Sequence, residues 1–130
     1  MASVKDMLKA LKRAKTYVDN SMLKTGKEDE NSFEDNIWHV AAELEYALFF
    51  ASMLVQDETT KSEWKPDPEL KKAGVESIVT VVRDLVAEAE KCTESSKLLE
   101  AYRHAYVARD CVLKIQKDLE KERRKALKKK

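Results

Sequence analysis

The stretch SFEDNIWHVAAELEYALFFASMLVQ, residues 32–56, decides the fold of this chain. It is the longest run without Gly, Pro or a charge cluster, and its apolar residues recur at helical spacing. One apolar stripe, suited to face a core, comprises Ile37, Val40, Ala41, Leu44, Leu48, Ala51 and Val55. A second set lies on roughly the opposite side and comprises Trp38, Ala42, Tyr46, Phe49 and Met53. A helix that is apolar all round has neighbours on more than one side. We therefore expect this helix to be shielded from water on two opposing sides.

The same stretch is not expected to cross a membrane. A spanning helix needs about 20 apolar residues in succession, and this run is interrupted by Asp35, His39, Glu43 and Glu45. The N-terminal sequence MASVKDMLKAL has no apolar run of the length found in signal peptides. The expected location is the cytoplasm, with no membrane partner.

The composition indicates an all-α protein. The chain has 130 residues, of which 38% are charged and only two are Gly and two Pro, as is typical of long helices in one domain. Apolar spacing and capping residues predict helices over roughly 3–24, 32–56, 68–92 and 96–122. The predicted fold is an antiparallel up-down-up-down four-helix bundle with a charged C-terminal helical extension. Residues 1–120 would form the bundle domain, and 121–130 a basic, solvent-exposed tail.

The longest predicted break between helices is DETTKSEWKPDP, residues 57–68. Asp67-Pro68-Glu69 closes it with a strong signal for a helix start, an Asp cap followed by Pro and an acidic residue. Trp64 stands in this polar loop. We expect it to fold back as a lid over the aromatic side of the central helix; the alternative is an exposed anchor for a partner. Gly74 is expected to allow another backbone to approach.

No pattern of catalytic, cofactor-binding or metal-ligating residues emerges. The chain lacks a Gly-rich phosphate loop, a G-x-S-x-G motif and the Glu-x-x-His spacing of carboxylate-bridged metal bundles. His39 and His104 are expected to be ordinary, partly exposed histidines. Cys92 and Cys111 fall at distant levels of the predicted hairpin, which excludes a disulfide between them. An enzyme is the minority interpretation, although a site assembled across subunits stays open.

Arg109 falls beside the apolar stripe of the fourth predicted helix. Two interpretations remain. Its stem packs while its head reaches water, or the guanidinium forms a desolvated pair with Glu43 or Glu45.

Surplus apolar side chains on the second and fourth helices predict self-association, because a monomer exposing them would present a large apolar patch. A homodimer is the simplest closed assembly that would cover these side chains. The alternative is that a helix of another protein covers them. The expected interface residues are Trp38, Phe49, Met53, Tyr102, Tyr106 and Leu113. The expected function is that of a non-enzymatic interaction or scaffold protein.

The alternative function is a nucleic-acid-associated accessory protein that uses its basic end. Residues 121–130 contain seven basic residues and one acidic, so the net charge of +1 leaves the other 120 residues at −5. The residues that would contact phosphates are Arg123, Arg124, Lys125, Lys128, Lys129 and Lys130. No aromatic residue follows Tyr106 to stack on bases.

Overall fold

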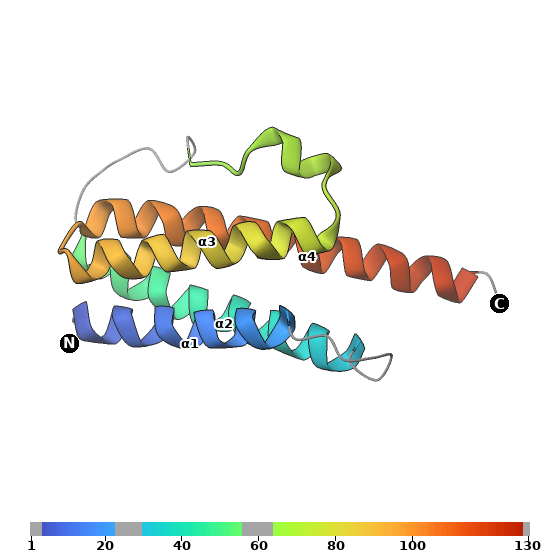
Figure 1. Cartoon of the computed structure of the whole chain (residues 1–130), viewed down its shortest axis with the longest axis horizontal. Helices are drawn as coiled ribbons and strands as arrows, with labels where there is room; N and C mark the ends of the chain where they lie inside the picture. The colour runs from blue at the N-terminus through green and yellow to red at the C-terminus, as the bar shows by residue number, and fades with distance from the viewer. Residues whose placement is uncertain (1–3, 23–29, 56–63, 129–130) are drawn as a thin grey trace.

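A computed structural model of the chain describes residues 4–22, 30–55 and 64–128, with Glu30 to Ser32 described by their backbone only. The described residues contain four α-helices and one short 3₁₀ helix. The α-helices are α1 (Val4–Met22), α2 (Glu30–Leu54), α3 (Val75–Glu94) and α4 (Leu98–Lys128), and the 3₁₀ helix is η3 (Pro68–Lys72). The all-α prediction is therefore confirmed, and the four helices pack as a bundle (Figure 1).

The core is built from one face of each α-helix. Small residues recur in it, among them Ala10, Ala14, Ala101, Ala105 and Ala108, which are fully buried and let the helices approach closely. From α2 it receives Ile37, Val40, Leu44, Ala47, Leu48 and Ala51, which confirms most of the predicted core stripe. The opposite side of α2 remains exposed to solvent. The prediction that α2 is shielded from water on two sides is therefore wrong for the single chain.

The direction of α3 differs from the prediction. Figure 1 shows α2 and α3 running in the same direction, with α1 and α4 opposite to both. The close helix pairs are α1 with α2, α3 with α4, α2 with α4 and α1 with α3, so α2 and α3 lie diagonally. The order is up-down-down-up rather than up-down-up-down. The end of α2 and the start of α3 therefore lie at opposite ends of the bundle (Figure 1). About 20 residues separate them in sequence, enough to span this length because extended chain covers about 3.3 Å per residue whereas a helix rises only about 1.5 Å.

The beginning of the third helix is also different. Asp67 caps as predicted, accepting a hydrogen bond from the Glu69 amide at 3.0 Å, but the helix it opens is the short η3. Extended backbone at Ala73 and Gly74 separates η3 from α3. A Cβ atom added at Gly74 would meet nothing within 4 Å. The expected close approach of another backbone is therefore absent at this glycine, which instead takes the N-cap position of α3.

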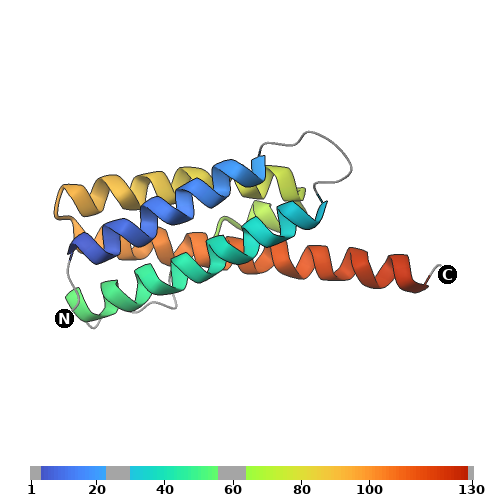
Figure 2. The same cartoon turned by 90° about the horizontal axis from the view of Figure 1, so that it is seen from below.

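The other helix limits agree more closely with the sequence. α1 starts and ends within two residues of the prediction. α2 begins at Glu30 and ends at Leu54, so each limit lies two residues before the predicted one. α4 continues to Lys128, six residues beyond the predicted end, and its last part extends past the other helices (Figures 1 and 2).

Candidate functional site

The exposed side of α2 carries a stripe of large apolar side chains. Trp38 is 69% exposed, Tyr46 56%, Phe49 58% and Met53 47%. Together with Ala42, which is also exposed, they follow one another by three or four residues, which places them on one helix face. We call these five residues the α2 stripe. Such residues are rarely clustered on the surface of a soluble monomer.

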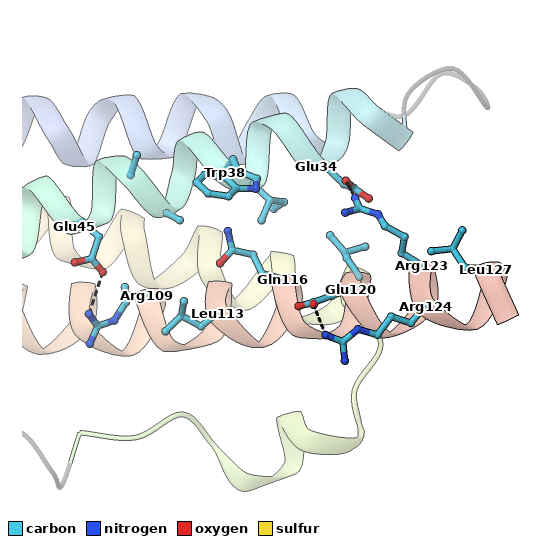
Figure 3. A pocket seen from close by; sticks show the side chains of 14 residues that line it. Glu34, Trp38, Glu45, Arg109, Leu113, Gln116, Glu120, Arg123, Arg124 and Leu127 are labelled. Atoms are coloured by element: carbon cyan, nitrogen blue, oxygen red, sulfur yellow. Dashed lines mark hydrogen bonds and ion pairs between the residues drawn. The ribbon is translucent and has the colours of Figure 1, made fainter.

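A groove between α2 and α4 adjoins the stripe, and Figure 3 shows the side chains that line it. Its central part is apolar or neutral, with Trp38 and Ala41 from α2 facing Leu113 and Gln116 from α4. Leu113 is 43% exposed. A second, shallow hollow lies on α2 itself and is lined by Ala42, Glu45, Tyr46, Phe49 and Phe50. The two hollows share Ala42 and Glu45 and so form one continuous surface.

Ion pairs bridge the two walls of the groove. Arg109 donates to Glu45 at 3.0 Å, and Arg123 pairs with Glu34 farther along (Figure 3). Arg124 pairs along its own helix with Glu120 at 2.7 Å. The apolar middle of the groove therefore lies between two cross-helix pairs.

The structure pairs Arg109 with Glu45, one of the two partners considered from the sequence, but the pair is not desolvated because the Glu45 side chain is 58% exposed. Its guanidinium lies 4.8 Å from the centre of the Tyr106 ring and pairs with Glu45. Burial opposes the charge, but the hydrogen bond and negative charge of Glu45, with Asp110, outweigh it and raise the pKa of Arg109. Glu43, the other candidate partner, pairs instead with Arg13 of α1 at 3.1 Å.

Two of the six predicted interface residues are covered by Trp64. Its ring makes edge-to-face contacts with Tyr102 at 5.3 Å and with Tyr106 at 5.6 Å between centroids. Tyr102 is only 5% exposed and belongs to the core, while Tyr106 is partly buried. Trp64 is thus a lid, as expected, but it covers α4 rather than α2. The remaining four, Trp38, Phe49, Met53 and Leu113, are exposed. Tyr46, which the sequence placed with the second apolar set of this helix, was left out of the predicted interface residues although it is 56% exposed.

The histidines and cysteines are not assembled into a site. His39 stacks on Tyr17 of α1 with ring centroids 4.5 Å apart. Cys92 and Cys111 are free thiols, and burial raises the pKa of Cys111 to about 11, with a contribution from Asp110. Within the described ranges, no group of three or more His, Cys, Asp and Glu side chains is arranged to hold a metal ion.

The basic end belongs to the exposed final turns of α4. Residues 120–128 are all exposed, and Lys129 and Lys130 lie outside the described residues. Arg123 and Arg124 are already paired with carboxylates. Among the described basic residues of this end, Lys121, Lys125 and Lys128 have no such ion pair.

One helix of the described residues, over Phe33–Leu54, is long and apolar enough to cross a membrane by length and composition alone. Core helices of soluble bundles meet the same criterion, so this is weak support for a span. Comparison of the chain with known protein families, curated proteins and solved structures finds no match.

Proposed function

We propose that the protein is a non-enzymatic interaction module that associates through the α2 stripe and the adjoining wall of α4. The observation that carries the proposal is the exposure of three aromatic rings, Trp38, Tyr46 and Phe49, on one face of one helix. Burying such rings gives much of the free energy of most stable interfaces. The simplest form is a homodimer in the cytoplasm, and a helix of another protein is the other possible occupant.

Tryptophan fluorescence can follow this association because the two Trp residues differ in environment. Trp64 is buried whereas Trp38 faces solvent, so the substitution Trp64→Phe leaves Trp38 as the only reporter. As the concentration rises through the micromolar range, we expect the emission of Trp38 to shift to shorter wavelength while light scattering shows the mass doubling. Added salt should leave both changes in place, because the contact is apolar.

Matched variants locate the surface. Phe49→Glu places a charge in the α2 stripe and should keep the chain monomeric. Ser77→Glu adds the same charge at an exposed position of α3, which lies diagonally from α2, and should behave like the original chain. A chain that stays monomeric, with Trp38 emission unchanged throughout, would contradict self-association.

The second candidate function is nucleic-acid binding through the end of α4. It is supported by the exposed basic residues of the last turns, from Lys121 to Lys128. Contacts of this kind would be independent of base sequence and would weaken with salt. The pairing of Arg123 and Arg124 with carboxylates reduces the charge available, which makes this the weaker candidate.

A further inference from the structure

We propose that the occupant of the α2 stripe is a second copy of the chain, whose α2 lies antiparallel to the first about a twofold axis between Glu45 and Tyr46. This inference rests on the proposed self-association and adds the partner and its register. It is carried by the symmetric spacing of four stripe residues, the residues that line the hollow on α2 and the pairing of Glu45, nearest the axis, with Arg109.

Four of the five residues of the α2 stripe are spaced symmetrically, whereas the fifth, Tyr46, mirrors Glu45. Trp38 and Met53 are equally far from the midpoint between residues 45 and 46, and so are Ala42 and Phe49. In a twofold interface each residue meets the position that mirrors it across the axis. An antiparallel crossing centred here therefore places Trp38 against the partner's Met53 and Phe49 against the partner's Ala42.

These pairs are complementary in shape and chemistry. Ala42 lines the hollow together with Tyr46 and Phe49 and has the smallest side chain of its lining, so the ring of the partner's Phe49 would lie over the smallest side chain of this surface. Trp38 meets a methionine, and thioethers make favourable contacts with aromatic rings. A parallel crossing would instead place Phe49 against the partner's Phe49 and leave the space at Ala42 unfilled.

The carboxylate nearest the axis is paired within each chain. Glu45 would face the partner's Tyr46 and lie near the partner's Glu45, and two unpaired carboxylates at this point would oppose association. Each Glu45 accepts a hydrogen bond from Arg109 of its own chain at 3.0 Å. Arg109 also pairs with Asp110 of its own chain at 3.3 Å, so the cross-helix pair reduces the negative charge near the centre of the crossing without removing it.

The exposed aromatic rings supply part of the area that an interface needs. At about 200 Å² per aromatic side chain, the exposed parts of Trp38, Tyr46 and Phe49 amount to about 350 Å² per chain. Standard interfaces bury about 800 Å² per partner. The three rings supply nearly half of this, and Ala42 and Met53 add to it.

Distances between spin labels would test the register directly. In a Cys92→Ser background, with Cys111 buried and left in place, a label is attached to Tyr46→Cys or to Trp38→Cys. We expect the labels at position 46 to lie close together across the dimer, and those at position 38 to be separated by about 22 Å along the helix axis, from about 1.5 Å of rise per residue. Short distances at both positions would indicate a parallel crossing and overturn the arrangement.

An exchange of the large and the small residue gives an independent test in unlabelled protein. Ala42→Phe should crowd the hollow and Phe49→Ala should leave it empty, so each is expected to raise the dimer Kd at least tenfold. The double variant Ala42→Phe/Phe49→Ala restores one ring and one small residue in every pair of an antiparallel dimer and should recover most of the affinity.

Circular dichroism of each variant checks that the bundle still folds, as expected for exposed positions. Lack of recovery in the double variant, while the original chain dimerises, would overturn the antiparallel register but not the proposed self-association. A monomeric original chain would overturn both.

Discussion

At the scale of single residues, burial sets the chemistry of the two thiols. Cys111 is 1% exposed, in the core, and the pKa of its thiol is raised to about 11 by burial, with a contribution from Asp110. Cys92 is partly exposed, and burial with the charges of Glu100 and Glu88 also raises its pKa. Both thiols are therefore protonated and poorly nucleophilic at neutral pH. Such thiols pack as small apolar groups rather than acting in catalysis.

The buried thiol predicts a loss of stability in alkali. Because the pKa of Cys111 is higher in the folded chain than the ordinary value of 9.0, its contribution is fully present below that value and is lost as the pH rises toward 11. Between about pH 8 and about pH 10.5 we expect about 2 kcal/mol of unfolding free energy to be lost through this group. Urea unfolding at both pH values measures the loss, and Cys111→Ala should remove this part of it. The same dependence on pH in the variant would show that Lys and Tyr titration accounts for the loss instead.

At the scale of elements, the α3–α4 hairpin shows how a short polar segment ends a helix. The amide of Lys97 donates to the carbonyl of Cys92 at 2.8 Å and that of Ser96 to Thr93 at 3.2 Å, the two hydrogen bonds of a Schellman motif. The motif requires a left-handed residue, and Ser96 takes that conformation with a φ of 62°. The sequence TESS predicts a tight connection, but it contains no glycine to mark the left-handed position.

A glycine at this position should stabilise the protein. The left-handed conformation costs a residue with a Cβ about 1–2 kcal/mol, and glycine avoids most of this cost. We expect Ser96→Gly to raise the free energy of unfolding by about 1 kcal/mol after the larger entropy of its unfolded chain is subtracted. Ser95→Gly is the control, because Ser95 has an ordinary φ of −89° and should gain nothing. Thermal melts of the two variants compare them, and equal shifts would refute this account of the hairpin.

At the scale of the whole molecule, the basic end and the α2 stripe are separable features. α4 continues without a break through residues 120–128, which are exposed. Strong helix formers occupy these positions, and Arg124 pairs with Glu120 one turn earlier. Among the described residues, an ion pair joins this end to another helix, between Arg123 and Glu34 of α2. Exposed pairs contribute at most about 1 kcal/mol, so the bundle does not depend on this end.

Deletion of residues 121–130 should therefore separate the two candidate functions. We expect the melting temperature to fall by no more than about 4 °C, the shift expected for about 1 kcal/mol, and the dimer Kd to stay unchanged. Any retention on a polyanion column should weaken with salt in the full chain and disappear in the shortened one. If the shortened chain no longer dimerises, the interface includes the end of α4 and not only the α2 stripe. Equal retention of both chains would remove the nucleic-acid hypothesis for this end.

The sequence by itself determined that the chain is helical, where most helices begin and end, and which face of α2 enters the core. These properties depend on the spacing of apolar residues and on capping groups, which act within a few turns. Only the tertiary structure decided that α3 runs parallel to α2, that Trp64 covers Tyr102, and that Trp38 and Phe49 remain exposed. Each of these depends on contacts between segments far apart in the chain. The long connection before α3 allowed either direction, and a periodic pattern records that a face is apolar but not what covers it.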